Sequence, residues 1–314
     1  MKKFLINFLA LCGIIIIITA IIECLLFTRP NIYSYKSDYV KTHADEIECL
    51  LLGNSHITDG LIPDSMGTGV FNMAILGRYL KYDVELAKMH VPNMHHLKVR
   101  IVPYDYYEFY LGRNEGTPEK IKSRERLSPT IKCMNYKYMG IHIDGWWCWS
   151  EFLNSNEDFM SRFKMSDKEL VECDSLGHIS LKLSERDENW REKGLPDRID
   201  LTKKRDEGQF ENLKAVFESF AEITKSYHIR LVLLRTPMYK TYQEMMNADI
   251  MEEMATFVDA LQKKYPHVEY YNYTFDDRFV DDDFNDASHL SDVGAAKFSK
   301  IVKKDILEKY NLLL

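Results

Sequence analysis

Five short apolar runs, separated by segments of helical periodicity, constrain the fold of this chain most strongly. The apolar runs cover residues 47–53, 70–74, 97–102, 229–234 and 268–273, and the helical patterns cover residues 79–90, 206–227, 242–264 and 292–310. Short apolar runs bounded by turn residues are typical of strands buried on both faces. Since strands that alternate with helices form parallel sheets, the sequence predicts a three-layer α/β sandwich with a five-stranded, flavodoxin-like parallel sheet.

A longer apolar run, over residues 4–27, precedes the alternating part. As a helix rising about 1.5 Å per residue, it would extend about 36 Å, enough to cross the hydrocarbon core of a bilayer. Lys2 and Lys3 precede the run, so the positive-inside rule predicts a cytoplasmic N-terminus. We predict a single-pass cell-membrane protein with a signal-anchor helix over residues 1–29 and an extracytoplasmic domain over residues 30–314. The alternative is a cleaved signal peptide, but no small-x-small cleavage site follows the run.

The overall composition excludes several classes of protein. Hydrophobic residues make up 46% and charged residues 28% of the 314 residues, which is ordinary globular usage. The net charge of −7 argues against nucleic acid as a partner. Six cysteines are too few for a disulfide framework, and the sequence leaves the pairing of Cys133, Cys148 and Cys173 open. No nucleotide-binding glycine pattern follows any predicted strand, so no organic cofactor is predicted.

The alternation breaks over residues 112–205, a charged and aromatic stretch with a tryptophan cluster at residues 146, 147 and 149. We predict an insertion over the ends of the strands. The tryptophans would form a lid or a glycan-facing wall, or they would fill a small subsidiary core.

The chemistry-bearing residues lie in two places, both at the predicted carboxyl edge of the sheet, where ligands bind in such folds. Ser55 follows the first strand on a turn that begins with Gly53. Asp286 and His289 precede the last helix. A carboxylate can orient a histidine that takes the proton of a serine hydroxyl, and the chain order Ser, Asp, His is a known one. The alternative for Asp286 and His289 is that they belong to an acidic surface loop, since residues 281–283 are all aspartates.

Together these pieces resemble the SGNH/GDSL hydrolase superfamily, and the resemblance extends over residues 46–312. Residues 53–56, Gly-Asn-Ser-His, match its first block, with Asn54 in place of the usual aspartate. Asp286 and His289 match its last block. The resemblance implies an SGNH hydrolase fold in which Ser55 is the nucleophile, His289 is the base and Asp286 orients the base.

Residues 71–77 look like the second block of the same superfamily, which contributes to the oxyanion hole. The resemblance implies an oxyanion and substrate site made by Asn72, Ala74 and Gly77 together with Ser55. The backbone amides of Ser55 and Ala74 would face the oxyanion. Ala74 stands where the block usually has glycine, a change that keeps a backbone donor.

The third block, normally Gly-x-Asn-Asp after the third strand, is missing. Residues 101–109 stand in its place and read Ile-Val-Pro-Tyr-Asp-Tyr-Tyr-Glu-Phe. Loss of the asparagine donor would reduce the rate by about 10²–10³. Either a tyrosine hydroxyl or Arg78 replaces it, or the activity is weak or specialised.

The N-terminal helix and the final Asp-x-x-His segment are similar to a bacterial cell-envelope branch that includes D-alanyl lipoteichoic acid transfer and alginate O-acetylation proteins. This resemblance implies a serine esterase or acyltransferase that acts on acyl groups, especially O-acetyl groups, of an envelope polymer such as a surface polysaccharide. A membrane-bound acyltransferase is then a candidate partner. The alternative is a non-catalytic envelope protein of the same fold that binds a polymer or a partner acyltransferase.

Two other enzyme classes fit the sequence poorly. The nucleophile elbow of α/β-hydrolases needs glycine two residues after the serine, where this chain has Ile57. A metal site built from His90, His95 and His96 would lie before the third strand, at the wrong edge of the sheet. No metal site is therefore predicted.

Overall fold

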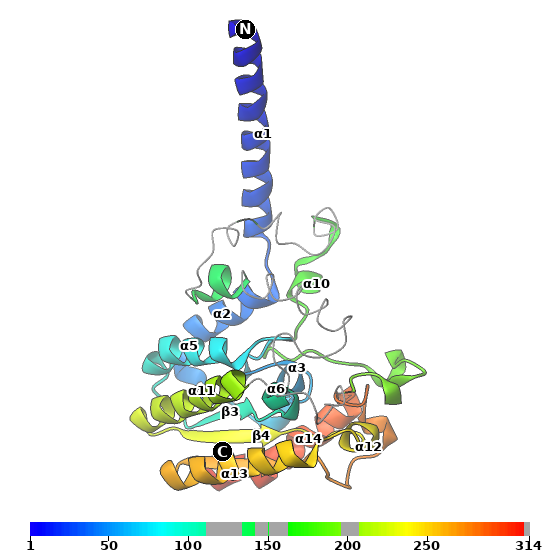
Figure 1. Ribbon diagram of the computed structural model, residues 1–314. Coiled ribbons are helices and arrows are strands. Elements are labelled where there is room, and N and C mark those ends of the chain that lie inside the picture. Colours follow the sequence, from blue (N-terminus) through cyan, green and yellow to red (C-terminus); the bar gives the residue numbers. More distant parts are fainter. Residues whose placement is uncertain (111–133, 142–149, 151–162, 196–206, 311–314) are drawn as a thin grey trace. The chain divides into compact units, whose positions relative to one another are not determined.

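The computed structural model describes residues 1–110, 134–141, 150, 163–195 and 207–310. Its strands are β1 (Cys49–Leu51), β2 (Val70–Asn72), β3 (Val99–Pro103), β4 (Arg230–Arg235) and β5 (Val268–Asn272). Its helices are α1 (Lys2–Thr28), α2 (Ile32–Thr42), α3 (Ser55–Thr58), α4 (Pro63–Met66), α5 (Leu80–His90), α6 (Tyr106–Tyr110), α10 (Asp167–Val171), α11 (Glu207–Ser226), α12 (Lys240–Gln243), α13 (Ala248–Lys264) and α14 (Asp292–Asp305) (Figure 1).

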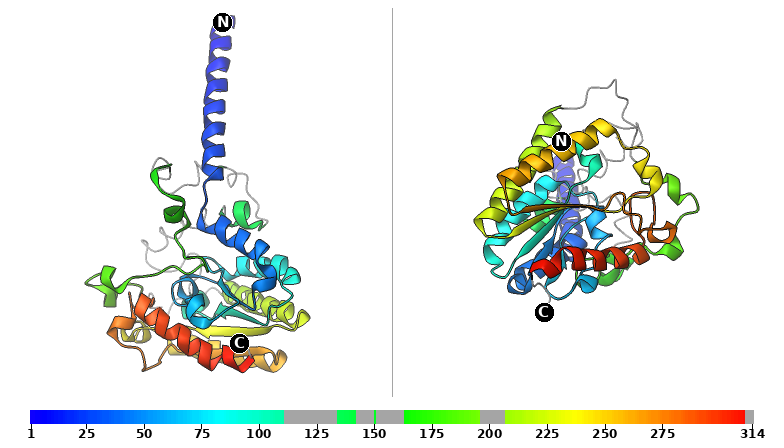
Figure 2. Two further views of the ribbon diagram at one scale, coloured as in Figure 1. Left: turned by 180° about the vertical axis from the view of Figure 1, so that it is seen from behind. Right: turned by 90° about the horizontal axis from the view of Figure 1, so that it is seen from below.

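The five strands form one parallel sheet in the order β2-β1-β3-β4-β5. This is the flavodoxin-like order, in which the strand order reverses between β1 and β3. Helices α5, α11 and α13 cover one face and α14 covers the other (Figure 2). The predicted fold class is therefore confirmed, because each apolar run found by periodicity supplies one strand.

Aromatic packing joins the sheet to the helices of the first face. The Phe109 and Phe217 rings stack with their centroids 5.8 Å apart, and Tyr104 packs at 4.8 Å from Phe109. All three side chains are buried. Since Tyr104 and Phe109 flank the polar residues that follow β3, this packing fixes the segment that runs past Ser55.

Three elements differ from the sequence-based expectation. The predicted helix over residues 242–264 is two helices, because the Asn247 side chain accepts hydrogen bonds from the amides of Asp249 and Ile250 and so begins α13 anew. The last predicted helix ends as α14 at Asp305 and continues only as a 3-10 turn, Leu307–Tyr310. Strand β5 is half-exposed rather than buried on both faces.

Contacts divide the chain into two compact units, Met1–Tyr35 with Glu125–Glu172 and Lys36–Arg124 with Cys173–Leu314. In the first unit, α1 has 27 residues and a mean hydropathy of 2.9 over its most apolar stretch, so it is long and apolar enough to cross a bilayer. The sheet and the residues discussed below belong to the second unit.

Part of the predicted insertion is described. The tryptophans at 146, 147 and 149 lie outside the described residues, as do Cys133 and Cys148. Residues 174–194, here named the crossing segment, lie along the carboxyl edge of the sheet. Its carbonyls accept backbone hydrogen bonds from described residues outside the segment: Asn72 N to Leu176 O at 2.9 Å, Asp292 N to Leu181 O at 2.7 Å, and Ala287 N to Lys193 O at 3.0 Å. The crossing segment thus links the end of β2 to the loop that carries Asp286.

Candidate active site

Ser55 is the first residue of α3, directly after the turn that leaves β1. Gly53 has a φ of 124°, and a Cβ atom there would collide with the Pro103 ring, so only glycine allows this close turn. Asn54 caps α3 by accepting a hydrogen bond from the His56 amide at 3.1 Å. The turn therefore places the Ser55 hydroxyl, which is partly exposed, beyond the carboxyl end of β1.

The loop before α14 holds the Asp286 carboxylate in a fixed orientation. Its Oδ1 atom accepts hydrogen bonds from the amides of Ser288 and His289, each at 2.8 Å. The Ser288 hydroxyl donates to the same oxygen at 3.1 Å. Because all three donors belong to Ser288 and His289, the loop itself sets the direction of the carboxylate.

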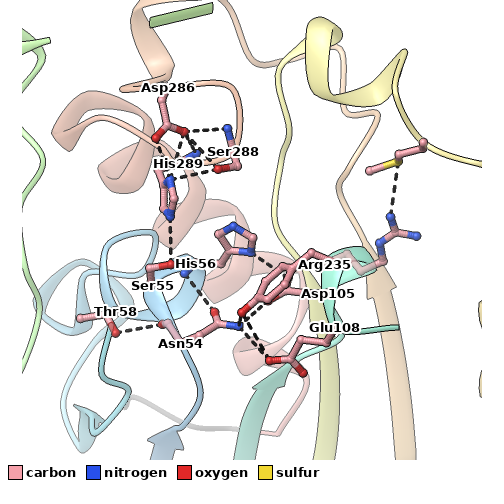
Figure 3. Close-up of polar contacts among 12 residues, drawn as sticks. Asn54, Ser55, His56, Thr58, Asp105, Glu108, Arg235, Asp286, Ser288 and His289 are labelled. Carbon is pink, nitrogen blue, oxygen red and sulfur yellow. Dashed lines mark hydrogen bonds and ion pairs between the residues drawn. The ribbon is translucent and has the colours of Figure 1, made fainter. Parts of the chain in front are cut away.

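The side chains of Ser55, His289 and Asp286 form a chain of hydrogen bonds, although Ser55 and His289 are 234 positions apart in the sequence (Figure 3). The His289 Nε2 atom is 2.9 Å from the Ser55 Oγ atom. The Nδ1 atom of the same ring is 2.9 Å from Asp286 Oδ2 and 3.0 Å from Oδ1. A carboxylate only accepts hydrogen bonds, so Nδ1 carries the proton, and Nε2 is left to accept the serine proton.

Charge within this group favours the ion pair. Burial disfavours the Asp286 anion, but the hydrogen bond and charge of His289 and the two backbone amides outweigh it, so the Asp286 pKa is well below its usual range. Burial likewise opposes protonation of His289, yet the hydrogen bond and charge of Asp286 raise its pKa above the ordinary 6.5. A raised pKa makes His289 a stronger proton acceptor when its ring is neutral.

The crossing segment supports Asp286 at Gly194. A Cβ atom at that position would lie 2.5 Å from Asp286 Oδ1 and 2.6 Å from Ser288 Oγ, and its φ of 68° is one that other residues rarely adopt. Backbone of the crossing segment therefore packs directly against the carboxylate.

Replacing Gly194 with alanine should push Asp286 away from His289 and lower the rate of Ser55 acylation by about 10²-fold, since small displacements of catalytic groups have effects of that size. The rate of acylation by an activated ester measures this effect. Glu192→Ala, at an exposed position of the same segment, is the control and should leave the rate unchanged. An unchanged rate in a folded Gly194→Ala variant would contradict this account of Asp286 positioning.

Two residues expected at the oxyanion site have other partners. The Ala74 amide donates to Asn72 Oδ1 at 3.1 Å, so it is not available to a substrate oxygen. The Asn72 side chain is fully buried and donates to the carbonyls of Ile57 and Leu61 at 2.9 and 3.1 Å. Asn72 therefore ties the end of β2 to α3, which corrects the expectation that Asn72 and Ala74 contact the substrate.

The turn after β2 also contains backbone amides that lack a hydrogen-bond acceptor among the described residues. The Ile75 amide donates to the Gly53 carbonyl at 3.0 Å, so the turns that follow β2 and β1 run side by side. Gly77 lies two residues further along, is exposed, and has a φ of 67°. Within the described part of the chain, neither its amide nor that of Ser55 has a hydrogen-bond acceptor. Backbone amides without an acceptor can donate to an oxyanion.

Arg78 does not replace the missing asparagine of the third block. Its side chain is buried, donates to the Met73 carbonyl at 2.9 Å and forms an ion pair with Asp83 at 3.0 Å. Arg78 is thus part of the packing beneath the turn, and the expectation that it could serve as a substrate donor is corrected.

A buried polar network beside Ser55, built on Asp105, was not predicted from the sequence. Asp105 Oδ2 accepts a hydrogen bond from the Asn54 amide group at 2.7 Å, and its Oδ1 lies 2.9 Å from the His56 Nδ1 atom. The Asn54 amide group also donates to the Tyr107 hydroxyl at 2.7 Å and to Glu108 Oε1 at 3.3 Å. Two features of the sequence could have indicated this network: an acidic residue two positions after the third strand, and a histidine directly after the serine.

The network explains why position 54 is an asparagine. Burial, strengthened by the charge of Asp105, raises the pKa of Glu108 well above its usual range. A second carboxylate at position 54 would meet Asp105 at hydrogen-bond distance. The amide of Asn54 instead supplies the donors that these acidic groups need.

A scan of the sequence against protein-family models finds no match, and neither does a search of curated proteins. A search of solved structures finds a chain described as "a putative platelet activating factor from Streptococcus pneumonia". The two chains are 12% identical, the alignment covers 94% of this chain and 98% of that one, and the TM-score is 0.41. So low a TM-score carries no argument about activity, and the inference of function rests on the geometry of the site.

Proposed function

We propose that this chain is a serine esterase or acyltransferase, anchored by α1 in the cell membrane with its N-terminus in the cytoplasm and its sheet domain outside. The observation that carries the proposal is the hydrogen-bonded order of Ser55, His289 and Asp286, with 2.9 Å from Oγ to Nε2. The proposed substrate is an O-acetyl ester on an envelope polysaccharide. This choice of substrate rests on the family resemblance and on the N-terminal helix.

The reaction follows from these contacts. Ser55 Oγ attacks the ester carbonyl while His289 Nε2 accepts its proton, and the Asp286 carboxylate stabilises the imidazolium that forms. The amides of Ser55 and Gly77 supply donors for the oxyanion. When the tetrahedral intermediate collapses, His289 returns the proton to the departing alcohol and leaves an acyl group on Ser55. Attack on this acyl group by water gives hydrolysis, and attack by a sugar hydroxyl gives transfer.

The test is turnover of p-nitrophenyl acetate by the full-length protein in detergent micelles. Wild type should release nitrophenol, and Ser55→Ala should not. Ser65→Ala, in the short helix α4, is the matched control and should behave as wild type. Equal turnover by wild type and Ser55→Ala would refute the assignment of Ser55 as the nucleophile.

The pH dependence of turnover should reflect His289. Only the neutral ring accepts the serine proton, so activity should fall as the pH falls through the His289 pKa. Because Asp286 raises that pKa above 6.5, the midpoint of the acid limb of kcat/KM should lie above pH 6.5. Thermal unfolding measured over the same pH range separates this effect from loss of fold. A midpoint below about 6 in the folded protein would contradict the charge coupling of His289 and Asp286.

A further inference from the structure

Arg235, the last residue of β4, is a buried cation that the mechanism above does not use. Its guanidinium donates hydrogen bonds to the sulfur atom of Met251 from both Nη1 and Nη2, each at 3.4 Å. The Nη2 atom also donates to the sulfur atom of Met246 at 3.8 Å. Figure 3 shows the guanidinium of Arg235 with a dashed line to a sulfur atom. Met251 lies in the first turn of α13, and Met246 lies just before that helix.

The groups around this guanidinium are neutral. Among the residues that the structure describes, no carboxylate forms an ion pair with Arg235. Burial raises the pKa of Tyr106 and of Tyr270, and the charge of Arg235 only partly opposes the rise, so both phenols keep their protons. A thioether sulfur is a weak hydrogen-bond acceptor. Buried charges are usually paired with a strong partner, whereas Arg235 is held by weak ones.

Oxidation of the Met251 sulfur would give Arg235 a stronger acceptor. Met251 is partly exposed, so a small oxidant can reach this residue from the solvent. Oxidation converts the apolar thioether of methionine into a polar sulfoxide, which disrupts packing where no polar partner is present. At Met251 the partner is already in place, because two N–H groups of a buried cation point at the sulfur.

We propose that Met251 is a site of oxidation by hydrogen peroxide, and that Arg235 binds the sulfoxide oxygen. A lone pair of the Met251 sulfur attacks one oxygen of the peroxide, and the O–O bond breaks. The proton on the attacked oxygen passes to the departing hydroxide, so the products are methionine sulfoxide and water. The sulfur gives up two electrons, and the peroxide is reduced. Rotation about the terminal bonds of this flexible side chain then turns the new oxygen toward the guanidinium.

The first test compares thermal unfolding of Met251→Gln and Met251→Leu in the full-length protein in detergent micelles. Glutamine has nearly the length of methionine and ends in a carbonyl oxygen, as a sulfoxide side chain also offers an oxygen. If Arg235 binds such an oxygen, the midpoint of Met251→Gln should exceed that of Met251→Leu by about 2 °C or more. Leucine is otherwise the better replacement for methionine, so a midpoint of Met251→Leu equal to or above that of Met251→Gln would overturn the proposal. Met89, 36% exposed on α5, is the control, and there glutamine should give no gain over leucine.

The second test oxidises the wild type and Met251→Leu with hydrogen peroxide, and mass spectrometry of peptides measures sulfoxide at each methionine. Both proteins undergo the other oxidations, so their difference isolates the effect of Met251. The unfolding midpoint of the wild type should decrease no more than that of Met251→Leu. A larger decrease in the wild type would overturn the proposal, as would a Met251 that stays reduced after peroxide has oxidised Met89. Neither test involves Ser55, so the outcome is independent of the proposed function.

Discussion

Replacing His289 with alanine is expected to lower the rate of Ser55 acylation by about 10⁴- to 10⁶-fold, the range found when one member of such a triad is removed. The reason is the 2.9 Å contact between Nε2 and the serine hydroxyl, since no other proton acceptor touches that hydroxyl among the described residues. Asp286→Asn should reduce the rate by about 10⁴-fold, because an amide can donate to Nδ1 and so favour the wrong tautomer.

Single-turnover acylation by p-nitrophenyl acetate measures both effects. The matched control is His96→Ala, an exposed histidine in the turn before β3, which should leave the rate unchanged. Thermal unfolding should show that the His289→Ala variant keeps its fold. A decrease of less than tenfold in that folded variant would mean that His289 is not the base.

Replacing Asn54 with aspartate is expected to lower the free energy of unfolding by about 3–5 kcal/mol, as for other uncompensated buried charges. The new carboxylate would stand 2.7 Å from Asp105 Oδ2, where the amide now donates. Like charges at this distance favour protonation of one of them, so the loss should be larger at pH 8 than at pH 5. The midpoint of thermal unfolding should decrease by about 10 °C.

Exchanging the side chains of positions 54 and 105 tests whether like-charge repulsion causes the loss of stability. Combining Asn54→Asp with Asp105→Asn restores one amide and one carboxylate at the contact, so more than half of the lost stability should return. Asn93→Asp, which adds the same charge at an exposed position, should change stability by less than about 0.5 kcal/mol. If the double variant is no more stable than Asn54→Asp, like-charge repulsion is not the reason for asparagine at position 54.

The fold class could be predicted from the sequence because the sheet is built from short apolar strands with strong local patterns. The helix break before α13 could not be predicted from periodicity alone. The apolar positions of α13 continue the pattern across Asn247, and the break depends on the capping hydrogen bonds of one side chain.

The same distinction applies to the site. Ser55, Asp286 and His289 could be placed at one edge of the sheet, because parallel strands bring their carboxyl ends together. The partners of Ala74 and Asn72 could not be predicted, since they depend on how the turn after β2 packs against α3. The Asp105 network unites residues that are about fifty positions apart along the chain, and no local pattern indicates such a contact.

The central claim is that the Ser55 hydroxyl is activated by His289, and fluorophosphonate labelling tests it most directly. The full-length protein in detergent micelles is treated with the probe, digested, and analysed by mass spectrometry beside Ser55→Ala and His289→Ala. The account predicts a single adduct on Ser55 in the wild type, no adduct at that position in Ser55→Ala, and slower labelling by at least 10³-fold in His289→Ala. A well-folded wild-type protein that acquires no adduct on Ser55 would contradict it.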